Sequence, residues 1–288
     1  MSSLEIEQSN WISDFVREAL AEDIGSGDVT TDSIVSKDQE AKAVWIAKEE
    51  GVLAGLDIAK EVFLELDDQI NWKPKFSDGE KVSEGQTIIE MSGNCRAILT
   101  AERTSLNIAQ RMSGIATATH RVVEILAEFD TNLLDTRKTA PGLRRLDKLA
   151  VKAGGGINHR MGLYDLAMIK ENHIVAAGGI TKAVQYVRVQ NPEIKIEVET
   201  TTLDEVLEAL RTGADIIMLD NMTIDEISEA VKIINGSAQT EASGGITVKN
   251  VREIAKTGVN YISMGFLTHS VRAFDISQRM IDVPGKSV

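Results

Sequence analysis

The sequence contains a single cysteine, Cys95, among its 288 residues. An internal disulfide is therefore excluded, and the cysteine content gives no indication of an oxidising compartment. The sequence also lacks any run of about 18 apolar residues, the length that a membrane-spanning helix requires. Its N-terminal segment is acidic and has no continuous apolar stretch, so we expect no signal peptide. From these absences we predict a cytoplasmic protein that has no membrane partner.

Basic residues are scarce, since 31 lysines and arginines stand against 44 aspartates and glutamates and the formal net charge is -13. This balance argues against a nucleic-acid partner, because phosphate contacts need clustered Lys and Arg. One segment departs from the average, with seven basic residues and a single acid, Asp147. The seven are Arg137, Lys138, Arg144, Arg145, Lys148, Lys152 and Arg160. A concentrated positive segment in an acidic protein predicts an anionic small-molecule ligand.

A solvated basic helix face would explain part of this segment without a ligand. We assign Arg145, Lys148 and Lys152 to such a face. Three basic residues lie outside that helix and need another explanation; these are Arg137, Lys138 and Arg160.

The first hundred residues predict a helix followed by a small α/β domain. Ser9 or Asn10 is expected to cap a helix whose apolar residues share one face and which ends before Gly25. Residues 28–98 are strand-like and irregular, with glycine-containing turn signals between short apolar segments. A long helical stretch from about residue 100 to residue 129 then carries the chain across a domain boundary.

The remaining sequence alternates short apolar strands with amphipathic helices. We expect six strands, at residues 132–135, 166–170, 194–199, 215–220, 238–241 and 261–264. Capping boxes begin helices at Thr202 and Thr223, and glycines such as Gly213 stand where helices should stop. Repeated βα units predict a parallel sheet, either doubly wound or closed into a barrel. The regular spacing favours a barrel.

Polar residues and glycines follow each predicted strand at its carboxyl end, where parallel barrels carry their working residues. Arg137, Arg160 and Lys170 suit anionic groups, because Arg pairs with carboxylates or phosphates in a bidentate manner. Glu199 and Asp220 suit Mg²⁺ or ribose hydroxyls. Glycine-rich loops after the last two strands suit a phosphate, because their backbone N–H groups approach it without a Cβ. These loops contain Ser243, Gly244, Gly245 and Gly265.

Each of these residues also has a purely structural explanation. Lys170 could be a surface lysine, Glu199 a carboxylate at a helix start, and Asp220 a turn residue. The loop at 243–247 could be a tight connection, and the three glycines before His159 could end a helix. Taken together, their common position at strand ends is better explained by one pocket.

Three long motifs resemble those of nicotinate-nucleotide pyrophosphorylase, also called quinolinate phosphoribosyltransferase (decarboxylating). They are DTRKTAPGLR at 135–144, KAGGGINHR at 152–160 and MIKENH at 168–173. Shorter matches follow at 197–199, 218–221 and 241–246, and another lies at 102–107 in the boundary helix. The resemblance covers nearly the whole chain.

The resemblance implies an open, six-stranded parallel α/β barrel (TIM-like) at residues 113–271. A smaller N-terminal α/β sandwich domain would occupy residues 1–112, completed by the tail at 272–288. It also implies a homodimer with shared active sites, in which Arg103 reaches the neighbouring subunit's site. The residues that would bind substrates are Arg103, Thr136, Arg137, Lys138, His159, Arg160, Lys170, Glu199, Asp220, Ser243, Gly244, Gly245, Met264, Gly265 and Phe266.

The implied reaction transfers phosphoribosyl from phosphoribosyl pyrophosphate to quinolinate, with loss of CO₂, as a step of NAD biosynthesis. Lys138, Glu199 and Asp220 would be catalytic, and the two acids would hold Mg²⁺. Other readings are a molybdenum-transport-associated homologue, a non-catalytic phosphate-binding barrel, and an aldolase that uses Lys170 as a Schiff base. The basic residues Arg137, Lys138 and Arg160 favour anion binding over imine formation.

Overall fold

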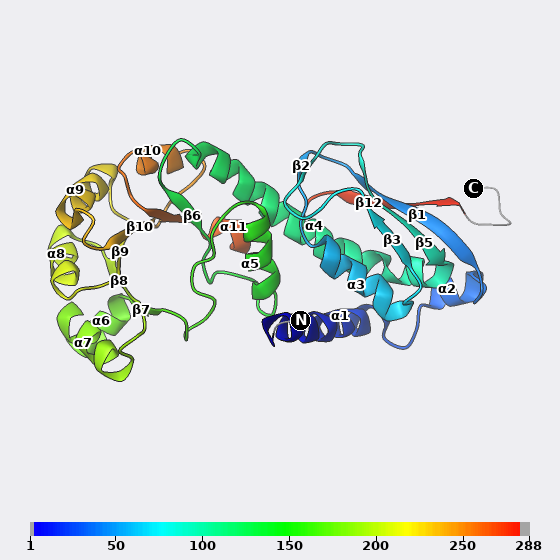
Figure 1. Ribbon diagram of the computed structural model, residues 1–288, viewed down its shortest axis with the longest axis horizontal. Coiled ribbons are helices and arrows are strands. Elements are labelled where there is room, and N and C mark those ends of the chain that lie inside the picture. The colour runs from blue at the N-terminus through cyan, green and yellow to red at the C-terminus, as the bar shows by residue number, and fades with distance from the viewer. Residues whose placement is uncertain (1–2, 283–288) are drawn as a thin grey trace. The chain divides into compact units, whose positions relative to one another are not determined.

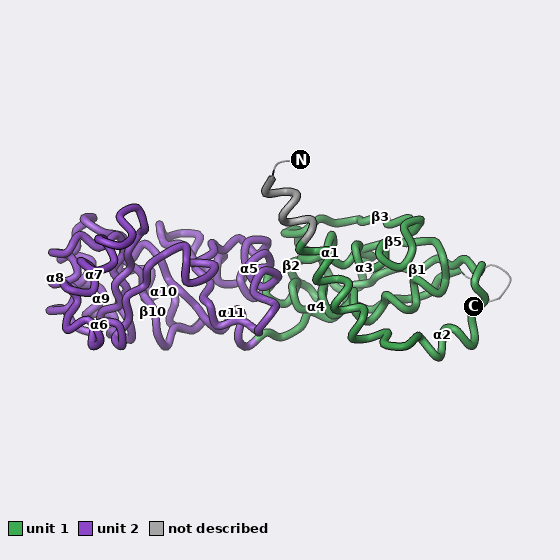
Figure 2. The backbone as a smooth tube through the Cα atoms, turned by 90° about the horizontal axis from the view of Figure 1, so that it is seen from below, with its two compact units in different colours: residues 1–117, 271–288 green, residues 118–270 purple. Residues whose placement is uncertain are grey.

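The computed structural model describes residues 3–282, with side chains described from residue 11 onward (Figure 1). The chain divides into two compact units, one formed by residues 1–117 and 271–288 and the other by residues 118–270 (Figure 2). Residues 283–288 of the expected tail lie outside the described residues. None of the described helices combines the length and the hydropathy that a membrane span needs.

The first unit contains a four-stranded antiparallel sheet whose strand order is β12-β1-β5-β3. Its strands are β1 (Glu40–Ala47), β3 (Asn71–Pro74), β5 (Thr87–Asn94) and β12 (Ile276–Asp282), while β2 (Gly51–Val52) pairs with β4 (Lys81–Val82). Its helices are α1 (Ser3–Ile24), α2 (Val29–Ile34) and α3 (Leu56–Leu66), and α4 (Cys95–Leu126) begins in this unit. Strand β12 therefore brings the C-terminal segment beside β1.

An aromatic cluster packs the first unit. Trp45 is fully buried and contacts Phe63 and Trp72, with ring centroids 6.1 and 5.3 Å away. The Trp45 indole donates a hydrogen bond of 2.8 Å to Gln278 Oε1 on β12. The buried Trp45 ring thus ties the C-terminal strand to the sheet by both apolar contact and a satisfied N–H.

The predicted start of the first helix was wrong. Helix α1 begins at Ser3, so Ser9 and Asn10 lie inside it. The preceding residues Leu, Glu, Ile, Glu and Gln mostly have high helix propensity, which outweighs the modest cost of Ser and Asn in a helix interior. The predicted end is confirmed, because α1 stops at Ile24 and Gly25 has a φ of +53°.

The second unit is a curved six-stranded parallel sheet with the strand order β6-β11-β10-β9-β8-β7. The strands are β6 (Asn132–Leu134), β7 (Ala167–Ile169), β8 (Ile196–Thr200), β9 (Ile216–Asp220), β10 (Gln239–Ser243) and β11 (Tyr261–Ser263). Helices α7 (Ile180–Gln190), α8 (Leu203–Arg211), α9 (Ile224–Ile234) and α10 (Val251–Ala255) lie along its outer side (Figure 1). The other helices of this unit are α5 (Arg144–Ala153), α6 (Glu171–Ala177) and α11 (Phe266–His269). The predicted six-stranded open barrel is confirmed.

The barrel is open because β6 and β7 form the two edges of the sheet rather than pairing with each other. On the β6 side the edge is met by Ile157, whose N–H donates to Leu133 O at 2.8 Å. In return, Asp135 N donates to Ile157 O at 3.3 Å. This bridge carries the segment that follows, including His159, into the wall of the barrel.

In the second unit, one of the two predicted capping boxes forms and the other is incomplete. Thr223 forms the predicted capping box with Glu226 at the start of α9. At α8, Thr202 accepts from Glu205 N at 3.3 Å, but the Glu205 carboxylate accepts from Thr201 N instead of closing the box. Gly213, after α8, has a φ of +71°, a left-handed conformation that favours glycine.

Candidate active site

A cavity of about 500 Å³ lies at the carboxyl ends of the parallel strands. Most of the predicted site residues line it: Thr136, Arg137, Lys138, His159, Arg160, Lys170, Glu199, Asp220, Ser243, Gly244 and Gly245. Further lining residues are Asp135, Met168, Met218, Asn221, Glu241 and Ser263. The strand ends therefore converge as the sequence pattern indicates.

Four predicted residues do not line this cavity. Met264 is 1% exposed within the barrel core, and its N–H donates to Leu134 O at 3.1 Å. Gly265 lies near the site, because a Cβ added there would meet Lys138 Cδ at 3.0 Å. Phe266 begins α11 and packs against the core. Arg103 is exposed on α4 in the first unit and is not among the lining residues.

Two arginines give the cavity donors that the protein does not use. Arg137 Nε is buried and has no hydrogen-bond partner in the part of the chain that the structure describes. Arg160 donates from Nη1 to Leu166 O at 3.1 Å and from Nη2 to Met168 Sδ at 3.7 Å. Burial and the nearby charge of Arg137 lower the pKa of Arg160. An anion bound between the two guanidinium groups would satisfy free N–H groups and relieve this repulsion.

Lys170 is more exposed than the apolar run before it indicates. Its side chain is 49% exposed, and Nζ lies 3.5 Å from Glu199 Oε2. Lys170 is the N-cap of α6, and its own N–H donates to His173 Nδ1 at 3.0 Å. The ammonium group is therefore open to solvent at the cavity mouth and only loosely paired.

Lys148 does not belong to a solvated face, contrary to the prediction. It is 1% exposed and ion-paired with the fully buried Asp135. Lys148 Nζ also donates to His159 O at 2.9 Å, while Asp135 accepts from His159 N at 2.9 Å and from the Asn158 amide at 2.6 Å. Burial lowers the pKa of Lys148 and raises that of Asp135, and their mutual attraction opposes both shifts. The i, i+3 spacing from Lys148 to the buried Val151 was the signal that could have indicated this burial.

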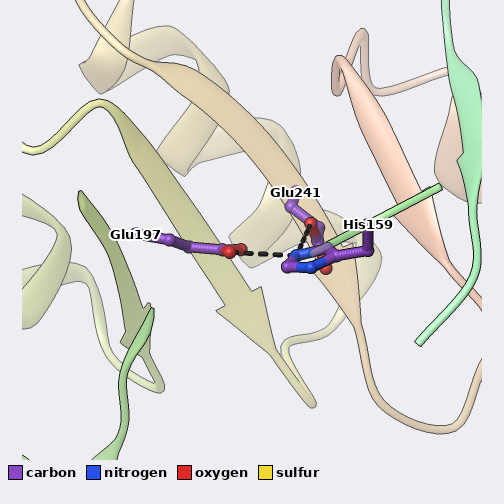
Figure 3. A group of neighbouring side chains, drawn as sticks. All are labelled: His159, Glu197 and Glu241. Carbon is purple, nitrogen blue, oxygen red and sulfur yellow. Dashed lines mark ion pairs between the residues drawn. The ribbon is translucent and has the colours of Figure 1, made fainter. Parts of the chain in front are cut away.

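Sequence reasoning did not connect a buried cluster of three side chains, two of which, His159 and Glu241, line the cavity (Figure 3). His159 Nε2 is 3.0 Å from Glu197 Oε2 and 3.3 Å from Glu241 Oε2, and both glutamates are fully buried. Among the described residues this group, rather than Glu199 with Asp220, has the composition of a three-ligand metal site. Glu197 and Glu199 share one face of β8 because strand side chains alternate, which was the available signal.

The pKa values of two groups in this cluster are raised. Burial and then the charge of Glu241 raise the pKa of Glu197 to about 7. Burial disfavours a charged His159 ring, but the two carboxylates outweigh it and raise the pKa of His159 to about 10. Arg160 N–H is directed at His159 Nδ1 at 2.7 Å, which opposes a second proton on the ring. The raised proton affinity therefore belongs to the cluster as a unit.

The loop after β10 has a conformation that requires glycine. Gly244 has a φ of +87° and Gly245 a φ of +62°. A Cβ at Gly244 would overlap the Asn221 side-chain amide and lie 2.9 Å from Asn221 N. Asn221 itself donates from N to Ser243 O at 2.9 Å and from Nδ2 to Asp220 Oδ2 at 2.7 Å. The backbone of the loop after β10 thus packs against Asn221 in the loop after β9, with no room for a residue larger than glycine at position 244.

Comparisons with known proteins agree with this geometry. Residues 28–113 match the family model for the quinolinate phosphoribosyl transferase N-terminal domain, and residues 115–279 match that for the C-terminal domain. The chain is 46% identical over 282 residues to quinolinate phosphoribosyltransferase (decarboxylating) 1 of Nicotiana glauca, covering 91% of this chain and 80% of the relative. It is 47% identical over 257 residues to a probable nicotinate-nucleotide pyrophosphorylase (carboxylating) of Bacillus subtilis, covering 89% of each.

A solved structure shares the fold over most of the chain. The nicotinate-nucleotide pyrophosphorylase from Francisella tularensis superposes with a TM-score of 0.89 and 44% sequence identity, covering 94% of this chain and 96% of that one. Together, both domain models, the identity across most of the chain and the open barrel lead to one conclusion. The chain belongs to the quinolinate phosphoribosyltransferase family.

Proposed function

We propose that the chain transfers phosphoribosyl from phosphoribosyl pyrophosphate to the ring nitrogen of quinolinate, and that nicotinate mononucleotide, pyrophosphate and CO₂ are released. One observation carries this proposal: a single cavity combines unused arginine donors with two carboxylates and a glycine loop. The strand order separates these groups. The acids and glycines follow the adjacent central strands β8, β9 and β10, and the basic residues follow the edge strands β6 and β7 or the segment between them.

The basic side of the cavity is assigned to quinolinate. Its two carboxylates would be held by Arg137, Arg160 and Lys170, with His159 beside them, because arginine forks match carboxylate geometry. Arg103 of a second copy would complete the site in a homodimer, as the family resemblance implies. A cytoplasmic location likewise stays a prediction from the sequence. We propose that residues 113–271 form the catalytic barrel domain and that residues 1–112 and 272–288 form the N-terminal domain.

The acidic and glycine-rich side is assigned to phosphoribosyl pyrophosphate. Backbone N–H groups from Ser243 to Gly245 would bind the 5′-phosphate, with Gly265 and Phe266 on the next loop. The Met264 side chain is buried and its N–H donates to Leu134 O, so we do not assign Met264 to the phosphate. Lys138 is exposed at the end of β6 and would stabilise the negative charge of the departing pyrophosphate.

Glu199 and Asp220 fit Mg²⁺. Both line the cavity from neighbouring strands, and Mg²⁺ is held by one or two carboxylates together with substrate phosphates. When bound, Mg²⁺ supplies positive charge that neutralises the pyrophosphate oxygens. Thr136, whose Oγ1 accepts from Lys138 N at 3.1 Å, shapes the loop that presents Lys138 to the same region.

The chemistry then follows from charge and position. Loss of pyrophosphate from ribose C1 leaves oxocarbenium character, and the pyridine nitrogen of quinolinate supplies the electron pair of the new C–N bond. The resulting pyridinium stabilises the carbanion that forms when the adjacent carboxylate leaves as CO₂, and that carbon is then protonated. No protein nucleophile is needed, since holding two anionic substrates in line is the main task of the site.

The direct test incubates the full chain with quinolinate, phosphoribosyl pyrophosphate and Mg²⁺. We expect equimolar nicotinate mononucleotide and CO₂. Nicotinate serves as the control acceptor, because it lacks the second carboxylate and cannot release CO₂. Turnover of nicotinate at a rate equal to that of quinolinate, or no product from either, would refute the proposal.

Replacing Glu199 by glutamine should weaken the response to Mg²⁺. Removing one of two carboxylates lowers the charge that holds a divalent cation, so we expect about a tenfold rise in the Mg²⁺ concentration for half-maximal activity. Titration of activity with Mg²⁺ at saturating substrates measures this effect. Glu205→Gln on α8, outside the cavity, is the matched control, and an unchanged Mg²⁺ dependence in Glu199→Gln would contradict the assignment.

Replacing Gly244 by alanine should raise the KM for phosphoribosyl pyrophosphate about tenfold, with a smaller change for quinolinate. The new Cβ would be strained at a φ of +87° and would push against Asn221, so the loop must move away from the phosphate. Gly213→Ala, at a φ of +71° with open space around it, is the control for backbone strain alone. Steady-state kinetics with each substrate varied in turn provide the measurement.

A further inference from the structure

We propose that Glu197 and Glu241 are positioning residues that hold the His159 ring by its Nε2 proton, so that Nδ1 faces Arg160 N–H and the His159–Arg160 pair is fixed at the cavity wall. This inference rests on the proposed function, because Arg160 is assigned there to quinolinate. It concerns two residues that touch neither substrate in that assignment. Both act through another residue.

The two carboxylates reach the ring from different strands. Glu197 lies on β8 and Glu241 on β10, the two neighbours of β9 in the sheet, and Figure 3 shows both carboxylates directed at the His159 ring. The oxygens of both carboxylates, like His159 Nε2, are buried and have no aligned hydrogen-bond partner in the described part of the chain. His159 Nε2, at 3.0 and 3.3 Å, is the one ion-pair partner of each carboxylate among the described residues. Two fully buried acids therefore converge on one ring nitrogen.

The opposite side of the ring fixes the position of the proton. The backbone N–H of Arg160 donates to His159 Nδ1 at 2.7 Å, so the Nδ1 lone pair is occupied and the ring proton lies on Nε2. The His159 backbone is held as well, since its N–H donates to Asp135 and its carbonyl accepts from Lys148. The His159 backbone and Nδ1 are thus hydrogen-bonded by the protein, and Nε2, which is buried, has the two carboxylates as its ion-pair partners.

Arg160 keeps guanidinium N–H groups that Leu166 and Met168 do not use. Its backbone is set by His159 Nδ1, and Nη1 is anchored on Leu166 O at 3.1 Å. A carboxylate that pairs with both arginine nitrogens needs the guanidinium plane within a small angular range. Loss of either glutamate would let the His159 ring turn, so that Nδ1 no longer accepts from the backbone N–H of Arg160. The orientation of the guanidinium plane would then be less fixed.

A bound divalent cation is the alternative use of the same three groups. A cation would need the lone pair of Nε2, and Nε2 would then carry no proton. The protonation of Nε2 therefore separates the two possibilities without any measurement of activity.

The test uses the full chain labelled with ¹⁵N-histidine, which contains four histidines. Replacing His120, His173 and His269 by glutamine removes all histidine ring signals except those of His159. We expect a protonated Nε2 with a downfield, slowly exchanging proton and an unprotonated Nδ1. In Glu197→Gln and Glu241→Gln this proton should exchange at least about tenfold faster. A ring without a proton on Nε2, or exchange unchanged in both variants, would overturn the proposal.

Kinetics supply the second readout. In both variants the KM for quinolinate should rise about tenfold, while the KM for phosphoribosyl pyrophosphate and kcat should change less than about threefold. Glu229→Gln, on the outer helix α9, is the control. Equal changes in both KM values would show a general structural defect and refute positioning. If one variant fails to fold, the other still decides. If the wild type does not use quinolinate at all, the proposed function fails. The NMR spectrum of the His159 ring still tests whether Glu197 and Glu241 hold that ring.

Discussion

Arg160→Ala should raise the KM for quinolinate by about 30- to 3000-fold and leave the KM for phosphoribosyl pyrophosphate within about threefold. Truncating one partner of a desolvated, hydrogen-bonded charge pair costs about 2–5 kcal/mol, and each 1.4 kcal/mol is about a tenfold change. Arg160 lines the cavity beside Arg137, and its guanidinium keeps donors that Leu166 and Met168 do not take up. Steady-state kinetics with each substrate varied separately measure the two constants.

Two matched variants sharpen this experiment. Arg160→Lys keeps the charge but not the planar fork, and should recover only part of the loss. Lys152→Ala removes an exposed basic residue from the same segment and should have no effect on either KM. Equal effects of Arg160→Ala on both substrates would refute its assignment to quinolinate.

Lys148→Met should destabilise the protein by about 3–5 kcal/mol, because it leaves the carboxylate of Asp135 buried without its counter-charge. At about 2–4 °C per kcal/mol this corresponds to a fall in Tm on the order of 10 °C, measured by differential scanning calorimetry. The expected loss is large because Asp135 is fully buried and also organises Asn158 and His159.

The same change at an exposed position gives the control. Lys152→Met, one turn later on α5, should shift the free energy of unfolding by less than about 0.5 kcal/mol. Adding Asp135→Asn to Lys148→Met should restore part of the stability, because no uncompensated charge then remains buried. A Tm for Lys148→Met equal to that of Lys152→Met would show that the buried pair has no such role.

The barrel and the place of its site could be predicted from the sequence because both have local signals. Apolar strands of a few residues recur between capped helices, and the polar residue after each strand identifies the end that carries function. Asp220 and Gly244 were found in this way. Their placement needs no knowledge of which strand lies beside which.

Pairings between distant segments could not be predicted in the same way. Lys148 looked like one more basic residue of a helix, and only the strand end thirteen positions earlier supplies its partner, Asp135. His159 was placed in the site, but its carboxylates come from two strands further along the chain. Local periodicity reports which face of an element is buried; it does not report what is buried against it.

Because β6 and β7 do not pair, the sheet of short strands keeps two edges, here called margins. An unpaired strand margin is a template on which a foreign strand can add, and longer margins make such addition easier. Each margin here is three residues long, and one is already met by Ile157. The molecule can therefore leave its sheet unclosed with little risk of self-association into fibrils. Backbone groups of β6 that would pair with a neighbouring strand in a closed barrel instead hold the loop that leads to His159.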